Sequence, residues 1–117
     1  MFKAWILTFI RAIAFLVSDD ASLQSAAIQM NTVNILLKNL EKAKAMDSLF
    51  YEKCLECGLI VASALSSINE DNRKQIVESK FLGLIVECMS SSNTNLRISA
   101  CQCARNLSRS VKNLRTN

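Results

Sequence analysis

The chain has 117 residues, of which 50% are hydrophobic and 21% are charged, and this composition fits one globular domain. The sequence has two glycines and no proline, so it lacks most of the residues that form the tight turns of an all-β sandwich. The absence of histidine excludes histidine dyads, triads and histidine-ligated zinc. A formal net charge of +4 is too small to indicate nucleic acid as a partner.

Residues 2–18 form an apolar stretch with helical spacing. One stripe consists of Trp5, Phe9, Ala12 and Leu16, and a second stripe beside it consists of Ile6, Ile10, Ile13 and Val17. The stretch is interrupted by Arg11 and is shorter than the roughly 20 residues of a membrane span. We therefore predict a buried helix, with a signal peptide as the alternative.

The rest of the chain predicts six more helices in a repeated order. Apolar periodicity places them at 23–29, 32–44, 49–65 with a cap at Asp47 or Ser48, 73–78, 81–89 and 96–111, with polar breaks at 18–22, 69–72 and 90–95. A short, a medium and a long helix thus occur twice. Leu40 and Met89 end the medium helices 49 residues apart, and Leu65 and Leu107 end the long helices 42 residues apart. Such spacing is typical of a solenoid of three-helix repeats.

Four segments, 72–78, 84–89, 95–100 and 105–108, together resemble one complete armadillo repeat. The landmarks are Asn72 at the start, Ile76-Val77-Glu78 and the terminal Asn106-Leu107-Ser108, although Lys80 stands where the family usually has glycine. The resemblance implies an all-α, right-handed superhelical solenoid that occupies residues 1–117 as one segment. Residues 2–18 would be the third helix of a partial repeat, 21–68 and 70–110 two repeats, and 111–117 the start of a further one.

Residues 104–116 resemble the armadillo scaffold subunits of CTLH-type ubiquitin ligases. This resemblance implies a non-enzymatic scaffold that positions substrate receptors for proteasomal degradation, and a chain that is a fragment or short isoform of a longer solenoid. The implied partners are other protein subunits, with no nucleic acid, membrane, small molecule or cofactor. The alternative is a peptide-binding adaptor such as a nuclear import receptor.

Peptide-binding armadillo proteins line a concave groove with a Trp and, four residues later, an Asn. The aligned pairs here are Gln102 and Asn106 in the last repeat, Ile60 and Ala64 in the middle one, and Arg11 and Phe15 in the first. Only Asn106 matches, which counts against binding of import signals, and we interpret Phe15 as a packing residue.

The candidate partner-binding residues lie on the last predicted helix. Gln102, Asn106 and Arg109 share one helical face, and Arg105 lies beside them. Basic residues continue after Glu87, the last acidic residue, without local neutralisation. These side chains are either a surface for an acidic partner or a plain solvated face.

The pattern of the five cysteines indicates reduced thiols with a structural role. It therefore predicts a protein of the cytoplasm and nucleus. Their odd number fits a reducing compartment. Cys54 and Cys57 have the spacing of a zinc or redox pair, but Cys101 and Cys103 would point to nearly opposite sides of a helix. We therefore expect all five thiols, Cys88 included, to be buried and inert, and no metal to bind.

No catalytic constellation is visible, and we expect no enzymatic activity. Gly58 and Gly83 are isolated within helical patterns and do not form a phosphate-binding loop. Glu52 and Glu56 lie four residues apart on one helix, and we interpret them as an exposed pair and not as an acid/base pair.

Overall fold

The chain is all-helical in the part that the computed structural model describes, as predicted. The description covers the backbone of residues 2–18, 20–67 and 70–115, and their side chains except those of 2–4, 28 and 109–115. Within these ranges there are seven helices and no strand: α1 (Phe2–Val17), α2 (Ala21–Gln29), α3 (Thr32–Lys44), α4 (Ser48–Ser66), α5 (Glu70–Glu78), α6 (Phe81–Met89) and α7 (Thr94–Arg115).

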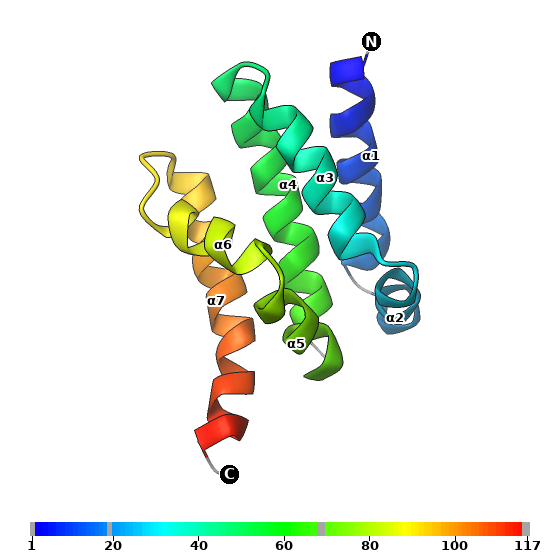
Figure 1. The fold of residues 1–117 in the computed structure, drawn as a ribbon, viewed down its shortest axis with the longest axis vertical. Helices are drawn as coiled ribbons and strands as arrows, with labels where there is room; N and C mark the ends of the chain where they lie inside the picture. The colour runs from blue at the N-terminus through cyan, green and yellow to red at the C-terminus, as the bar shows by residue number, and fades with distance from the viewer. Residues whose placement is uncertain (1, 19, 68–69, 116–117) are drawn as a thin grey trace.

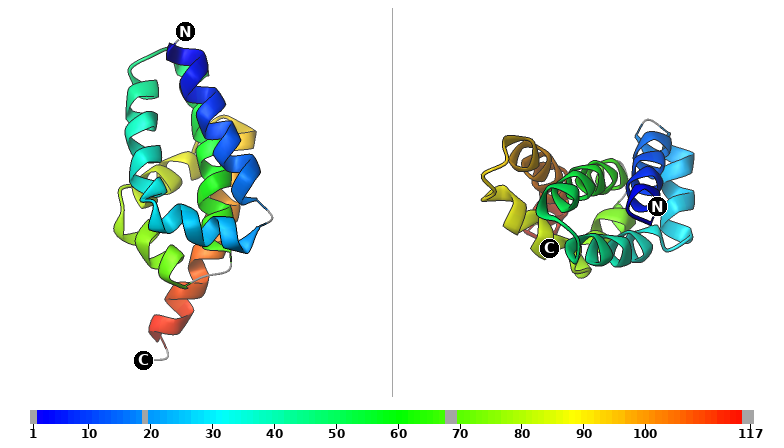
Figure 2. Two further views of the ribbon diagram at one scale, coloured as in Figure 1. Left: turned by 90° about the vertical axis from the view of Figure 1, so that its right-hand side faces the viewer. Right: turned by 90° about the horizontal axis from the view of Figure 1, so that it is seen from above.

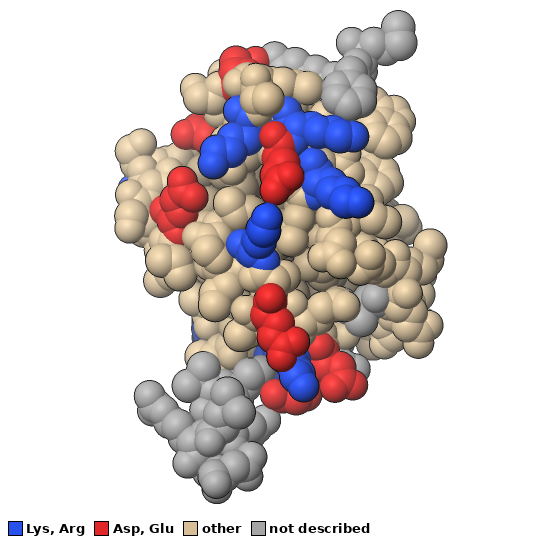
Figure 3. Space-filling view, in the orientation of Figure 1, with Lys and Arg blue, Asp and Glu red and all other residues tan. Residues whose placement is uncertain are grey.

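The helices form layers in which α4 is central. The three longest helices, α1, α4 and α7, lie side by side, with α4 packed against both of the others (Figure 1). Helices α3 and α6 make a second layer on one side of them, and the short helices α2 and α5 connect the layers (Figure 2). The outer side of α3 and α6 carries interspersed basic and acidic side chains (Figure 3). Among the described residues, no helix is both long enough and apolar enough to cross a membrane.

Short polar side chains begin several of these helices. The predicted cap of α4 is confirmed, because Asp47 accepts a hydrogen bond from the backbone N–H of Phe50 at 2.9 Å. Asp20 accepts from the N–H groups of Ser22 and Leu23 at the start of α2, which lowers the pKa of its carboxyl group. The loops thus satisfy amide groups that the first helical turns leave unpaired.

The predicted polar break at 69–72 is wrong from residue 70 onward, whereas residue 69 lies outside the described residues. Glu70 to Asn72 are helical, and Asn72 and Arg73 are buried. Arg73 pairs with Glu70 at 2.7 Å and donates to the carbonyl oxygen of Ser66 at 3.1 Å. The first turn of α5 is therefore stabilised by the packing of polar side chains, and apolar periodicity does not predict such a turn. At the other end of the chain, residues 111–115 continue α7 without a break.

A hydrogen bond shows that the two three-helix sets correspond residue by residue. Gln24 of α2 donates its side-chain N–H to the carbonyl oxygen of Val17, at the end of α1, at 2.7 Å. Arg73 of α5 makes the same bond to Ser66, at the end of α4. Donor and acceptor are both displaced by 49 positions, so a shift of 49 residues relates α1–α3 to α4–α6.

The core runs along the inner faces of all seven helices. Ile10 of α1 and Leu59 of α4 are fully buried at corresponding positions, and Ile76, Phe81 and Leu107 extend the core toward the C-terminal end. The prediction of a buried helix at residues 2–18 is therefore confirmed for one side of α1 only, because its other side carries exposed apolar side chains.

Candidate functional site

The side-by-side helices α1, α4 and α7 present a surface that contains most of the aligned groove positions. A shallow pocket of about 270 Å³ on it is lined by Ser18 of α1, by Ile60, Ser63, Ala64 and Ser67 of α4, and by Gln102 and Asn106 of α7. Two of the three aligned pairs therefore lie together. We call this surface, with Phe15 one turn before Ser18, the third-helix face.

Asn106, which matches the family position, is engaged within the chain. Its side-chain amide nitrogen donates to the carbonyl oxygen of Ser63 at 3.0 Å and to the hydroxyl oxygen of Ser63 at 2.9 Å. The amide nitrogen therefore already has two acceptors within the chain. A bound peptide would have to displace Ser63 before this nitrogen could donate to it.

The interpretation of Phe15 as a packing residue is wrong. Its side chain is 84% exposed, and Ile60 at the neighbouring aligned position is 41% exposed. Phe15 lies on the side of α1 opposite the buried Ile6 and Ile10, and it belongs to neither of the two apolar stripes of this helix. The third-helix face thus offers Phe15 where a peptide-binding ladder would have an asparagine, and Ile60 where it would have a tryptophan.

The three candidate residues with described side chains, Gln102, Arg105 and Asn106, do not line one common pocket. Arg105 lies in a separate groove of about 410 Å³ between α6 and α7, which we call the α6–α7 groove; its lining is Met89, Arg97, Ile98, Cys101, Gln102 and Arg105. Gln102 lines both this groove and the third-helix face, and Asn106 lines only the latter. The side chain of Arg109 lies outside the described residues.

The α6–α7 groove combines an apolar floor with guanidinium groups. Arg97 is held in place, because it donates to the carbonyl oxygen of Ser91 at 2.7 Å and to the hydroxyl of Thr94 at 3.2 Å. Arg105 is exposed. Ile98 and Met89, which line the same groove, are exposed apolar side chains. Such a groove suits an apolar protein surface that carries carboxylates.

The buried thiols are held protonated. Burial raises the pKa of Cys54 to about 11 and the pKa of Cys103 to about 12. The Cys103 thiol donates to the carbonyl oxygen of Leu59 at 3.0 Å. Burial also raises the pKa of Cys57, and a hydrogen bond from Arg11 partly offsets this effect. Because the thiolate is the nucleophile and metal ligand, these thiols are poorly suited to either role.

The expectation that every thiol is buried is wrong for the half-buried Cys57 and for Cys101. Cys101 departs from it most. It is exposed, because it lies on the side of α7 opposite the buried Cys103. The part of the chain with described side chains contains no group of three or more cysteine or acidic residues that could hold a metal ion.

Two features were not predicted from the sequence. Ser63 anchors Asn106 through a contact that spans 43 residues, and a hydroxyl in a helix gives no sign of such a partner. The second feature is an apolar groove between α1, α2 and α3. Its residues belong to three separate periodic patterns, which sequence spacing does not bring together.

The described residues thus define an all-α protein in which three long helices lie side by side and expose apolar and amide groups. No family model and no solved structure matches the chain. The chain is similar to GID complex subunit 5 of Schizosaccharomyces pombe (strain 972 / ATCC 24843), with 31% identity over 91 residues. The match covers 74% of this chain, which spans about 12% of the length of that relative.

Proposed function

We propose that the chain is an armadillo-type solenoid that acts as a non-enzymatic scaffold in a multi-protein ubiquitin ligase, where it positions substrate receptors. The observation that carries this proposal is the similarity to GID complex subunit 5 over 74% of the chain. Residues 104–116 also resemble armadillo repeat-containing protein 8, a scaffold subunit of the CTLH-type ubiquitin ligase, and this resemblance points to the same class of complex.

The repeated geometry supports the solenoid part of the proposal. The equivalent bonds of Gln24 and Arg73 show that α4–α6 repeat α1–α3 with a constant shift. Stacked units of this kind bury their faces against neighbours and leave an extended surface for partners.

The exposed groups support the binding part. The third-helix face presents Phe15 and Ile60, and apolar side chains of this size contribute to protein interfaces when they are desolvated. The α6–α7 groove adds Arg97 and Arg105 for a partner that carries carboxylates. We propose that protein subunits bind to these two surfaces, in the cytoplasm and nucleus.

The alternative function, a peptide-binding adaptor such as a nuclear import receptor, has one observation in its favour. Asn106 lies on the third-helix face beside Gln102, as the family pattern requires. However, its amide nitrogen donates to Ser63, and the middle aligned pair is Ile60 and Ala64 in place of tryptophan and asparagine. The adaptor proposal is therefore the weaker of the two.

Affinity purification of the tagged full chain distinguishes the two functions. The scaffold proposal predicts that ubiquitin ligase subunits copurify in fixed proportion to the chain. Copurification of proteins with basic import signals, competed by a synthetic basic peptide, would favour the adaptor. Enrichment of neither class would contradict both.

A further inference from the structure

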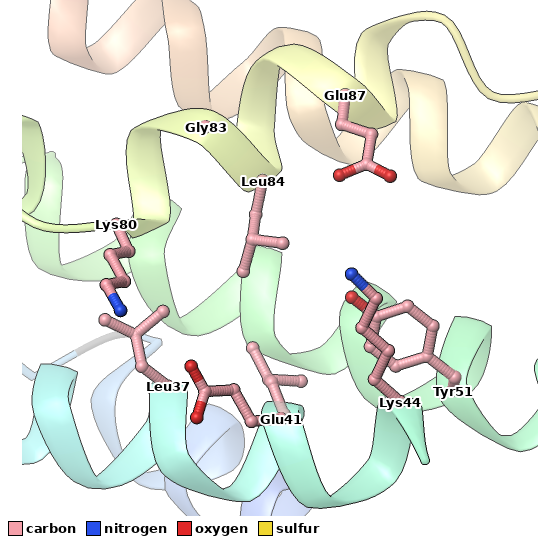
Figure 4. Close-up of a pocket in the computed structure, with 9 residues that line it drawn as sticks. Leu37, Glu41, Lys44, Tyr51, Lys80, Gly83, Leu84 and Glu87 are labelled. Atoms are coloured by element: carbon pink, nitrogen blue, oxygen red, sulfur yellow. The ribbon is translucent and has the colours of Figure 1, made fainter. Parts of the chain in front are cut away.

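The helices α2–α4 and α5–α7 form two units that are joined firmly on one side and loosely on the other. On the firm side, α4 packs closely against α7, and the buried Cys103 thiol donates to the carbonyl oxygen of Leu59 at 3.0 Å. On the loose side, α3 and α6 make few contacts among the described residues, and a groove of about 300 Å³ lies between them (Figure 4). We call it the α3–α6 groove.

Each wall of the α3–α6 groove carries one lysine and one glutamate, and all four side chains are exposed. Lys80, at the start of α6, and Glu41 of α3 lie at one end of the groove, and Lys44 of α3 and Glu87 of α6 lie at the other (Figure 4). Opposite charges therefore face each other across the groove at both ends. Among the residues with described side chains, these four charges form no ion pair with one another. The groove thus holds apart charges that attract each other.

The groove also has room to close. Gly83 lies in the middle of its α6 wall, and a Cβ atom on this glycine would have no neighbouring atom within 4 Å. Leu37 and Leu84 point into the space between the two helices and are half-buried (Figure 4). Movement of α6 toward α3 would therefore remove apolar surface from water as well as bring the opposite charges together.

The third-helix face lies on the opposite side of the layer that contains α4 and α7 (Figure 2). There Asn106 of α7 donates to Ser63 of α4, so this side of the contact between the two helices is closed. The buried contact between Cys103 and Leu59 holds α7 on α4 and acts as a pivot. A rotation of α5–α7 about this pivot that brings α6 toward α3 therefore moves Asn106 away from Ser63.

We infer that the α3–α6 groove is a switch for the third-helix face: when the ion pairs across the groove form, α6 moves toward α3 and Asn106 is released from Ser63. The inference deepens the proposed scaffold function and rests on it, because that proposal assigns protein partners to the third-helix face. In the structure the groove is open and the amide of Asn106 is bound within the chain. A partner that binds the released amide stabilises the closed groove, since the coupling between two sites is reciprocal.

The separation of α3 and α6 in the full chain tests the closure. Spin labels at Lys38→Cys and Val86→Cys, two exposed positions outside the groove lining, report this separation by double electron–electron resonance. Cys57 and Cys101 are replaced by alanine, so that the remaining native thiols are buried. We expect the separation to decrease as the ionic strength is lowered, because weaker screening strengthens ion pairs between exposed groups.

Substitutions in the groove identify the groups that close it. Lys44→Glu should abolish most of the response to ionic strength, and the exchange of charges in Lys44→Glu with Glu87→Lys should restore it. Lys53→Glu makes the same change in net charge at an exposed position of α4 outside the groove, and it should keep the wild-type response. Gly83→Leu changes no charge but should also abolish the response, because its side chain fills the space into which the walls move.

The side-chain amide of Asn106 tests the coupling to the third-helix face. Its hydrogens, assigned by their loss from the NMR spectrum of Asn106→Ala, should exchange with solvent about threefold faster at low than at high ionic strength, as the strength of exposed ion pairs allows. Rates are compared with those of Gly83→Leu at the same ionic strength, which removes the direct effect of salt on exchange. Lys44→Glu should remove the difference, and Lys44→Glu with Glu87→Lys should restore it.

Three results would overturn the inference. The first is a separation of α3 and α6 that does not depend on ionic strength. The second is a response that Lys44→Glu leaves intact or that Lys53→Glu abolishes, which would place its cause outside the groove. The third is closure of the groove without faster exchange at Asn106, which would show that the two sides of α4 and α7 are not coupled. No ligase subunit takes part in these measurements, so copurification of such subunits tests the proposed function separately.

Discussion

Leu40 packs so closely against Gly58 that a Cβ atom on residue 58 would lie 3.3 Å from Cδ1 of Leu40. Gly83, one layer away on α6, has no atom within 4 Å of the same position. Both glycines are helical, and glycine costs about 1 kcal/mol in a helix relative to alanine. We predict that Gly83→Ala raises the free energy of unfolding by about 0.5–1 kcal/mol, and that Gly58→Ala gives a smaller gain or a loss because Leu40 must move.

Urea denaturation of the two variants checks this prediction. A gain for Gly58→Ala equal to that for Gly83→Ala would show that Leu40 does not limit the space beside residue 58.

Arg73 provides a second test, because Gln24 makes the equivalent bond with a neutral amide. Arg73→Ala should lower the free energy of unfolding by about 1.5–3 kcal/mol, since it removes the hydrogen bond to the carbonyl oxygen of Ser66 and the ion pair with Glu70. Arg73→Gln should recover part of this loss, because a glutamine can donate to Ser66 as Gln24 donates to Val17. Denaturation curves that coincide for the two variants would refute the equivalence of the two helix ends.

Thiol reactivity should separate the exposed cysteine from the others. Cys101 is exposed, whereas Cys54, Cys88 and Cys103 are buried with raised pKa values. At pH 7.5, an alkylating reagent should therefore modify Cys101 first and the buried thiols only after the chain opens. Peptide mass spectrometry at successive times measures the order, and early modification of Cys103 would mean that α7 does not stay packed on α4.

The same raised pKa values predict a loss of stability at high pH. A thiol of the unfolded chain ionises near its ordinary pKa of 9.0, whereas Cys103 in the folded chain keeps its proton until about pH 12. Above pH 9 the unfolded chain therefore binds fewer protons, and the free energy of unfolding falls as pH rises. At pH 10 the contribution from Cys103 is about 1 kcal/mol. The fall should be shallower in Cys103→Ala, and equal slopes for the two proteins would contradict a buried Cys103.

The sequence predicts helix positions well because apolar periodicity in this chain follows burial. Helices α3 and α6 have the predicted bounds, and Asp47 caps α4. The start of α5 could not be predicted, because its polar residues are buried through a bond from Arg73 to Ser66 that local patterns do not contain. The bounds of α3 and α6 were thus encoded locally, whereas the start of α5 depended on the packing of its polar residues.

The candidate site was predicted only in part. Alignment placed Gln102 and Asn106 with Ile60 and Ala64, and the structure brings these four together. It separates Arg105 from Asn106 because adjacent residues on a helix differ by about 100° in direction. The exposure of Phe15 could have been predicted, because Phe15 belongs to neither of the two apolar stripes of α1.

The most direct test of the scaffold function compares copurification of ubiquitin ligase subunits with the wild-type chain and with a Phe15→Asp, Ile60→Asp variant. Both side chains are exposed, so the variant should keep its helical content, and Leu49→Asp serves as a control at an exposed position outside the third-helix face. We predict that quantitative mass spectrometry shows ligase subunits with the wild type and the control, and at least a tenfold loss with the variant. Absence of ligase subunits from the wild-type sample would contradict the proposed function, and equal recovery with the folded variant would contradict the third-helix face as the surface that binds them.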